Sequence, residues 1–471
     1  MFLPSVQFYS GHTERQIPIQ RKSTHTSIMG NEEMHYPPGI LDNPSSSILN
    51  GGILKGEILI RRLFLSLSIL FGLVISFGWS TSCFSQTAAP RPPISIGDFQ
   101  PKPQLKVAST DIDQAKFPVV DIHSHFWIRL KHDTDSLEQF VAMMNRNNIA
   151  LSVSLDGTLG QQLDDHIDYL WRNHKNRFLI FTNIDWKGTG KQDDPTTWVC
   201  NQPGFAKKIA FELAEAKTRG VSGLKVFKSF GLENRNADGS FTEIDDERFD
   251  PIWVACGELG LPVIMHTADP SAFFEPIDAN NERYEELSRR PEWHFPEGKF
   301  PRRNELHAAR NRLFAKHPKT TFIAAHFGND AEDLQETSQL LLKHPNVVVE
   351  FASRISELGR QPFTSRDFFL KHSDRILFGT DGPWPEARYR AYWRFLETRD
   401  EYFAYSEKPI PPQGIWRIYG IDLPDEVLEK IYYKNAVRVI PGVKERLDGW
   451  NLLHIDDSTN PDGASPQKRG P

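Results

Sequence analysis

Short apolar runs recur along the chain from about Phe117 onward, and a longer segment of mixed apolar and polar residues separates each run from the next. Runs that are apolar at nearly every position are typical of strands in a parallel sheet whose faces are covered by helices. The predicted strands are Val119–Ile122, Ala150–Leu155, Phe178–Ile184, Gly223–Phe227, Leu261–Met265, Thr321–Ala325, Val347–Phe351 and Ile376–Phe378. The segments between them predict helices at Ser136–Asn145, Phe205–Lys217, Pro251–Leu259, Glu305–Lys316, Ala331–Leu342 and Ser365–Lys371.

Eight strands that alternate with helices are the number that a closed (β/α)8 barrel requires. An open, doubly wound sheet uses the same alternation, but it would place a glycine-rich phosphate loop after the first strand. His and Ser stand there instead. We therefore predict an α/β chain in which residues 117–446 fold as a TIM barrel.

The parts of the chain that flank the barrel have a different character. Residues 1–57 are rich in Ser, Pro, Asn and Gly, which predicts a disordered extension or an over-long translated start, with Met29 or a later codon as the true beginning. Residues 87–116 are predicted to form a linker. The polar C-terminal residues 447–471 are predicted to form a disordered tail.

Residues 58–86 resemble an export signal. Arg61 and Arg62 lead into the uncharged apolar run 63–79, and small residues follow it. The run is close to the shortest length that spans a bilayer, so a membrane tether is the alternative to a cleaved signal. Lipidation at Cys83 is a further alternative. We expect export to the periplasm or cell envelope.

Composition excludes several classes of protein. The net charge of −6 and the pI near 6.3 argue against a nucleic-acid binder, so we expect a small-molecule substrate as the partner. Cys83, Cys200 and Cys256 are the three cysteines, which is too few for a disulfide framework or a thiolate-rich zinc site. Homo-oligomerisation is left open by these data.

Two histidines, His123 and His125, end the first predicted strand. Side chains two residues apart on a strand share a face, and two neutral imidazoles that converge are half of a zinc-type site. Active sites of TIM barrels lie at the carboxyl ends of the strands. The polar residues at the other strand ends are Asp156, Asp185, Lys225, Lys228, His266, His326, Arg354 and Asp381. Of these, His266, His326 and Asp381 can bind metal and can converge on the first pair.

Four motifs along this barrel carry a resemblance to a known family. They are Asp121-Ile-His-Ser-His125, Val263-Ile-Met-His266, Ile323-Ala-Ala-His326-Phe-Gly328 and Leu377-Phe-Gly-Thr-Asp381-Gly-Pro383, with Tyr433-Lys-Asn-Ala-Val-Arg438 as the closing helix. Residues 117–446 resemble the amidohydrolase superfamily, and within it the amidohydrolase-related group of metal-dependent hydrolases and zinc-dependent decarboxylases.

The resemblance implies a divalent ion held by His123, His125, His266 and Asp381. Zinc is the first expectation, with manganese, iron or nickel as alternatives, and one ion is expected rather than two. Bound zinc lowers the pKa of water toward about 7, and Asp381 would take the proton and deliver it to the leaving group. His326 would polarise the scissile carbonyl or hold a second metal. Taken singly, His266 and His326 could each be an ordinary core histidine.

Lys225 has a role that the sequence leaves open. Its segment is similar to the fourth strand of binuclear relatives, where a carboxylated lysine bridges two metals. Alternatively, Lys225 binds a substrate carboxylate or extends to solvent. Lys228 has the opposite strand parity and is expected to face away from the centre. Arg354 and Trp384 follow strand ends and are expected to line the substrate pocket, with the insertion 268–304 as a lid or wall.

These observations predict a metal-dependent hydrolase that cleaves an amide, ester or lactone-like bond. The alternative is a metal-dependent, non-oxidative decarboxylase on the same barrel, in which Lys225, Lys228 or Arg354 would hold the departing carboxylate. A second alternative, a binding protein without catalysis, is disfavoured because every main ligand position is filled.

Overall fold

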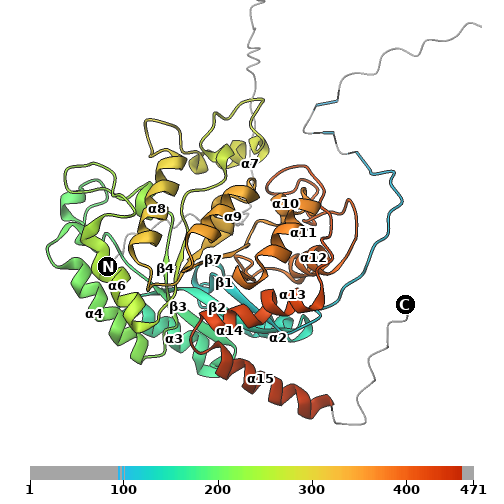
Figure 1. Cartoon of the computed structure of the whole chain (residues 1–471), viewed down its shortest axis with the longest axis horizontal. Helices are drawn as coiled ribbons and strands as arrows, with labels where there is room; N and C mark the ends of the chain where they lie inside the picture. The colour runs from blue at the N-terminus through green and yellow to red at the C-terminus, as the bar shows by residue number, and fades with distance from the viewer. Residues whose placement is uncertain (1–93, 96–97, 100, 459–471) are drawn as a thin grey trace, which may run out of the picture. The chain divides into compact units, whose positions relative to one another are not determined.

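The computed structural model describes residues 94–95, 98–99 and 101–458 (Figure 1). The expected extension 1–57 and the expected signal or anchor 58–86 lie outside these residues, so export stays a prediction. Within the part of the chain that is described, none of the helices has both the length and the apolar character that a membrane span requires.

Eight parallel strands form one sheet in chain order, which confirms the predicted TIM barrel. The sheet closes where Ile122 N donates to Phe378 O at 3.0 Å and Ser124 pairs with Gly382. The strands are β1 (Val119–Ser124), β2 (Ile149–Thr158), β3 (Phe178–Asn183), β4 (Gly223–Val226), β5 (Val263–Met265), β6 (Phe322–Ala324), β7 (Val347–Glu350) and β8 (Ile376–Leu377).

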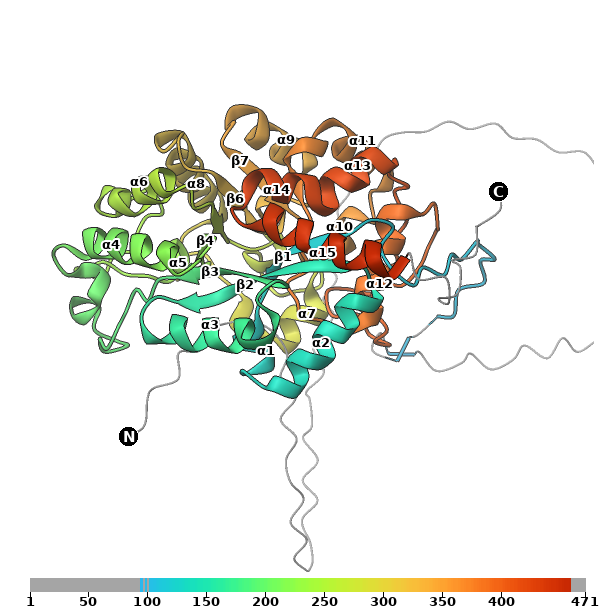
Figure 2. The same cartoon turned by 90° about the horizontal axis from the view of Figure 1, so that it is seen from below.

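The α-helices surround the strands (Figures 1 and 2). Those that follow the strands include the six that the sequence predicted, with ends shifted by a few residues. The helix Gln161–His174 was not predicted. The helices are α1 (Phe126–Leu130), α2 (Thr134–Arg146), α3 (Gln161–His174), α4 (Phe205–Thr218), α5 (Ser229–Leu232), α6 (Asp250–Leu259), α7 (Tyr284–Arg289), α8 (Arg303–Lys316), α9 (Leu334–Lys343), α10 (Ile355–Leu358), α11 (Pro362–Lys371), α12 (Glu386–Glu397), α13 (Asp425–Glu429), α14 (Asn435–Val439) and α15 (Val443–Ser458).

Two apolar cores result from the alternation of side chains along each strand. On β4, Leu224 and Val226 pack outward among the helices, and the residue between them faces the barrel interior. The interior core includes Leu447 and Trp450 of α15. Arg446 of α15 donates to Lys175 O just before β3, so α15 crosses the amino ends of the strands, as Figure 2 shows. Burial of these two side chains explains why the helix runs past the predicted boundary at 446.

The end of the predicted linker packs against the barrel. The backbone N and the Oγ1 of Thr110 donate to Asp400 at 2.7 and 2.8 Å, and Ile112 and Ala115 are buried. This segment therefore extends the domain rather than merely connecting to it.

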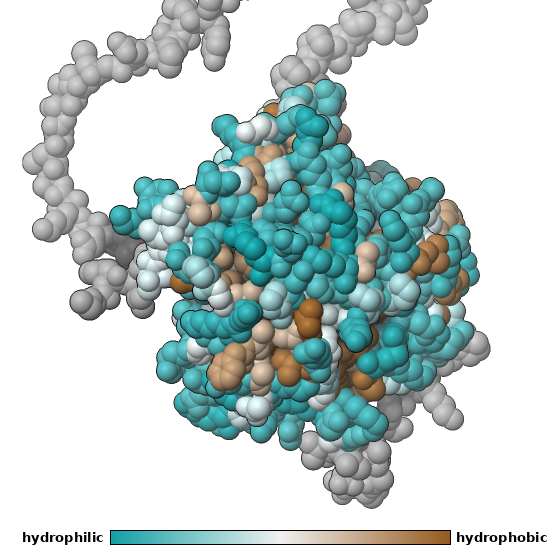
Figure 3. Space-filling view, turned by 60° about the vertical axis from the view of Figure 1, so that its left-hand side comes forward, coloured by the Kyte–Doolittle hydropathy of each residue, from teal (hydrophilic) through white to brown (hydrophobic). Residues whose placement is uncertain are grey.

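The insertion after β5 is fixed to the barrel at several points. Its buried Arg283 donates to Glu357 of α10 and to Glu286 within the insertion. Arg303, where α8 begins, donates to Asp269 O at 3.1 Å. The insertion is therefore anchored to the barrel, and its role as a lid or wall of the site stays a prediction. The face turned forward in Figure 3 is mostly hydrophilic, with a small group of apolar side chains in its lower half.

Candidate metal centre

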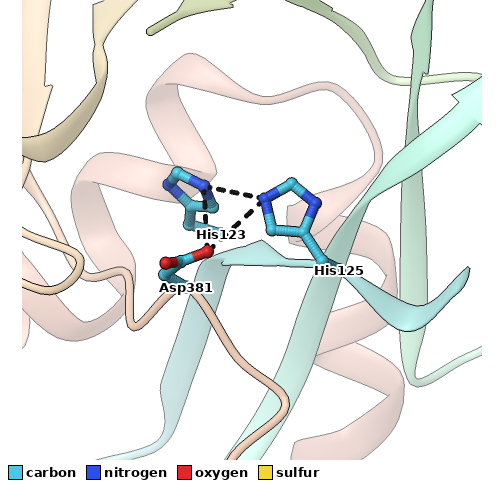
Figure 4. A group of neighbouring side chains, drawn as sticks. All are labelled: His123, His125 and Asp381. Atoms are coloured by element: carbon cyan, nitrogen blue, oxygen red, sulfur yellow. Dashed lines mark hydrogen bonds and ion pairs between the residues drawn. The ribbon is translucent and has the colours of Figure 1, made fainter. Parts of the chain in front are cut away.

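The two histidines at the end of β1 and an aspartate after β8 point their polar atoms at one another (Figure 4). The Nε2 atoms of His123 and His125 are 3.2 Å apart. The Oδ1 atom of Asp381 lies 3.8 Å from the first and 3.5 Å from the second. Closure of the barrel produces this arrangement, because it brings the end of β8 beside the end of β1.

A buried carboxylate holds each imidazole from behind. His123 Nδ1 lies 2.9 Å from Glu350 Oε1, and His125 Nδ1 lies 2.7 Å from Asp156 Oδ1. Since a carboxylate accepts hydrogen bonds, each Nδ1 carries the proton, and each Nε2 keeps a lone pair that faces the other. Carboxylates in this position orient metal-binding histidines and raise their basicity.

The arrangement fits a divalent cation. Two lone pairs and a carboxylate oxygen face one another, which is repulsive without a cation between them and attractive with one. Burial holds the pKa of His123 well below its usual range, so the ring is neutral and able to bind metal. Burial opposes ionisation of Asp381, but the nearby positive charges, of which Arg129 is the strongest, lower the pKa of Asp381 to about 2. The donor set suits zinc, manganese, iron or nickel.

Glu350, the last residue of β7, supports the centre from inside the barrel. Its carboxylate oxygens accept hydrogen bonds from three groups: His123 Nδ1, the backbone N of His326 at 2.7 Å and the backbone N of Ala352 at 2.6 Å. Burial raises the pKa of Glu350 to about 7, and the two backbone N–H donors oppose that rise. Gly379 makes room for it, because a Cβ there would lie 2.6 Å from Glu350 Oε2.

His326 and His266 lie side by side at the edge of this cluster. The ring centroid of His326 is 4.8 Å from that of His123 and 4.4 Å from that of His266. Together with His123 and Glu350, His326 forms a second buried group of potential ligands. His266 Nε2 lies 3.4 Å from Asp269 Oδ1, and among the described residues His266 joins neither group of converging ligand atoms. Its role as a metal ligand stays a prediction.

Lys225 is the residue of β4 that faces the barrel interior. It is 1% exposed, and its Nζ has no hydrogen-bond partner among the described residues. Burial lowers the pKa of Lys225 to about 8, against the opposing effect of nearby carboxylates, of which Glu350 is the strongest. The ammonium group therefore lies near the cluster without a hydrogen bond to any described residue, with the centroid of the Phe227 ring 5.4 Å from Nζ.

Two arginines and a tryptophan form a cationic wall beside Asp381. Arg129 Nη2 donates to Asp381 O at 2.7 Å and lies 3.7 Å from its Oδ2. The guanidinium groups of Arg129 and Arg388 lie 3.7 and 3.9 Å from the ring centroid of Trp384. Arg388 also donates to Ser353 Oγ at 3.4 Å, and Ser353 Oγ donates to Asp381 Oδ2 at 3.3 Å. Trp384 thus holds two cations near the cluster.

The profile of the amidohydrolase family matches residues 120–442, a range that contains all of these side chains. The chain belongs to the amidohydrolase family. Membership in this family, together with the buried cluster of His and carboxylate ligands, indicates a metal-dependent enzyme.

Several solved structures are similar to this amidohydrolase. 2,6-Dihydroxybenzoate decarboxylase bound to 2,6-dihydroxybenzoate is 16% identical, with 68% of this chain and 98% of that chain covered and a TM-score of 0.41. 5-Carboxyvanillate decarboxylase from Novosphingobium aromaticivorans, with manganese and a nitrobenzoic acid, is 16% identical, with 69% and 95% covered and a TM-score of 0.38. 4-Oxalomesaconate hydratase from Rhodopseudomonas palustris is 14% identical, with 72% and 99% covered and a TM-score of 0.38. None of the curated proteins matches the chain by sequence.

Two further predicted side chains of this amidohydrolase are engaged within the protein. Arg354 is buried and donates to Asn329 Oδ1 at 2.5 Å. Lys228, which strand parity predicted to face away from the centre, forms an ion pair of 2.5 Å with Asp269, the carboxylate beside His266. Both cations are therefore already paired with neighbouring side chains of the protein.

Sequence reasoning missed Glu350, Arg129 and Arg388. Glu350 had a usable signal, because it is the one charged residue within the apolar run Val347–Phe351. Arg129 and Arg388 belong to α1 and α12, and no local pattern marks their positions in the sequence. Asp185, in contrast, is exposed and bonds to the backbone of its own turn.

Proposed function

We propose that the protein is a metal-dependent decarboxylase that acts on a small carboxylic acid. The observation that carries this proposal is the ammonium group of Lys225, which is buried beside the metal cluster without a hydrogen-bond partner among the described residues. A buried cation without a partner is unfavourable. A carboxylate on the substrate would supply the partner that the chain does not.

The cations near Asp381 support an anionic substrate. Arg388 is partly exposed, and its hydrogen bond to Ser353 Oγ is long at 3.4 Å. Its guanidinium group can therefore exchange that bond for a stronger one to a carboxylate. Arg129 stays bound to the Asp381 backbone and fixes the ligand loop.

The residues that hold the ion in this proposal are His123, His125 and Asp381, with His266 as the predicted fourth ligand. The bound ion supplies an electron-withdrawing centre next to the substrate. The bond between the carboxyl carbon and its neighbouring carbon breaks, CO2 leaves, and the electron pair stays on the neighbouring carbon.

Lys225 donates the proton that this carbon needs. With a pKa near 8, it is protonated at neutral pH and can act as a general acid. Asp381 has a pKa of about 2, so it is ionised and holds no proton to give. In a decarboxylation, therefore, Lys225 and not Asp381 is the proton donor. We retain His326 as a predicted contact of the substrate.

Hydrolysis of an amide, ester or lactone-like bond is the second candidate. The position of Asp381 favours it, because an ionised carboxylate 3.5 and 3.8 Å from the two imidazole Nε2 atoms can accept a proton from a water at the same centre. In that reaction Lys225 would bind a substrate carboxylate and transfer no proton.

The test is to incubate metal-loaded full-length protein with small aromatic and aliphatic carboxylic acids, and separately with carboxylate-bearing amides, esters and lactones. Decarboxylation predicts release of CO2 and, in heavy water, one deuterium at the product carbon. Lys225→Met should abolish that release, whereas Lys207→Met on the exposed side of α4 should not. Incorporation of 18O from water without CO2 release would overturn the proposal in favour of hydrolysis. Binding of an acid without any turnover would favour a binding protein.

A further inference from the structure

The turn that carries His326 has an unusual backbone. In the segment Ala325–Asn329, four consecutive residues are left-handed, with φ of 54° at His326, 62° at Phe327, 67° at Gly328 and 59° at Asn329. Gly adopts this conformation freely and Asn tolerates it, but it is strained for Phe and His. Such strain persists only where surrounding contacts fix the backbone. The His326 ring is itself held by Ala352 O, which lies 2.9 Å from its Nδ1.

Asn329 supplies several of these contacts. The residue is fully buried. Its Nδ2 donates to the backbone oxygens of Thr267 at 2.8 Å and Ala268 at 3.0 Å. Its Oδ1 accepts a hydrogen bond from Arg354 Nη2 at 2.5 Å, and its backbone oxygen accepts one from Arg303. All polar atoms of the side chain are therefore in use.

Asn329 and the partners of its side chain belong to three different strand ends. Thr267 directly follows His266 at the end of β5, and Arg354 lies in the loop after β7. Asn329 itself is three residues beyond His326, after β6. One amide therefore connects the loops that position the two histidines.

We propose that Asn329 is a positioning residue that sets the separation of the His266 and His326 rings and thereby tunes the metal centre. Asparagine suits this place because it tolerates a left-handed backbone and can donate two hydrogen bonds while it accepts a third. The effect on metal binding rests on the proposed metal-dependent function. The hydrogen bonds that connect the two loops do not depend on that function.

Asn346 offers a matched control. Its Nδ2 likewise donates to three backbone oxygens, those of Phe314 at 3.1 Å, His317 at 3.1 Å and Thr320 at 3.0 Å. Asn346 precedes β7, at the opposite end of the strand from the metal cluster. Asn346→Asp therefore removes the same kind of hydrogen bond, from a side-chain amide to backbone oxygens, at a distance from the metal centre.

The experiment compares Asn329→Asp with Asn346→Asp in the full-length protein. Aspartate keeps the acceptor for Arg354 but cannot donate to the two carbonyls. We expect Asn329→Asp to raise hydrogen–deuterium exchange in both segments 265–269 and 325–330, and Asn346→Asp to raise it in neither. Manganese binding, measured by competition with a chelator, should weaken 10- to 100-fold only in Asn329→Asp.

Asn329→Gly removes the side chain and still permits the left-handed backbone. It therefore serves for the same measurements if the aspartate variant does not fold. Increased exchange in 325–330 alone, with 265–269 unchanged, would overturn the proposal, because the amide would then support only its own turn. If a variant shows increased exchange in both segments but binds manganese as tightly as the wild type, the proposed effect of Asn329 on the metal centre would be overturned. A wild-type protein that binds no manganese contradicts the proposed function instead, and the exchange data still decide whether Asn329 ties the loops.

Discussion

Replacement of Lys225 by Met should make the metal-free protein more stable, although it removes the residue to which we assign proton transfer. Burial lowers the pKa of Lys225 from 10.5 to about 8. Because the pKa of the folded state is below that of the unfolded state, the contribution of Lys225 to stability is complete above about pH 10.5 and is lost as the pH falls through about 8. This lowering of the Lys225 pKa corresponds to about 3 kcal/mol of destabilisation of the folded protein at pH 7.

Methionine has a similar length and no charge, so it fits the same space without this cost. We expect Lys225→Met to raise the free energy of unfolding by about 3 kcal/mol at pH 7, and the gain to shrink toward zero as the pH approaches 10.5. The assay is urea unfolding of both proteins in the presence of a chelator at pH 7 and pH 10. Lys207→Met, at an exposed position of α4, should change stability by less than about 0.5 kcal/mol.

Equal or lower stability of Lys225→Met at pH 7 would refute this reasoning. Lys225 would then have a partner that offsets its burial, and the carboxylated lysine of a binuclear centre would be the first explanation. In that case the stability of the wild-type protein would depend on added bicarbonate, while that of the variant would not.

Three other substitutions test the surroundings of the cluster. Glu350→Gln places an amide N–H group opposite a backbone or ring N–H donor, so metal binding should weaken 10- to 100-fold, or about 1.4 to 2.7 kcal/mol, in chelator competition. Gly379→Ala puts a Cβ 2.6 Å from Glu350 Oε2, so it should lower the free energy of unfolding by about 1–3 kcal/mol and weaken metal binding; an unchanged protein would contradict this packing. Arg388→Met should raise KM for an acid substrate about 10-fold with little change in kcat, whereas Arg390→Met on the same helix should leave both unchanged.

The barrel was predictable because its strands are short, apolar and separated by helical segments. Helix α3 was missed although Leu163, Ile167 and Leu170 recur at helical spacing, because charged and other polar side chains separate them. The end of the domain was also placed too early, because Leu447 and Trp450 occupy the barrel interior although polar residues surround them in the sequence. In both cases a few buried side chains decide the structure, and a polar average along the chain conceals them.

For the site, closure of the barrel made the approach of His123, His125 and Asp381 predictable, because strand ends of a TIM barrel meet at one face. The proton positions on the rings were not predictable, since they depend on Glu350 and Asp156 lying behind them. Spacing along the chain likewise cannot reveal which atom of a ring faces a neighbour. In the structure His266 Nε2 lies beside a carboxylate of the insertion, and its role as a metal ligand stays a prediction.

Metal content per chain tests the central claim most directly. Elemental mass spectrometry of the purified full-length protein, after incubation with zinc or manganese and removal of free ions, should find about one divalent ion per chain. A folded His123→Ala/His125→Ala variant should have lost it. A wild-type protein that retains no ion, or a double variant that binds the ion as tightly as the wild type, would contradict the account.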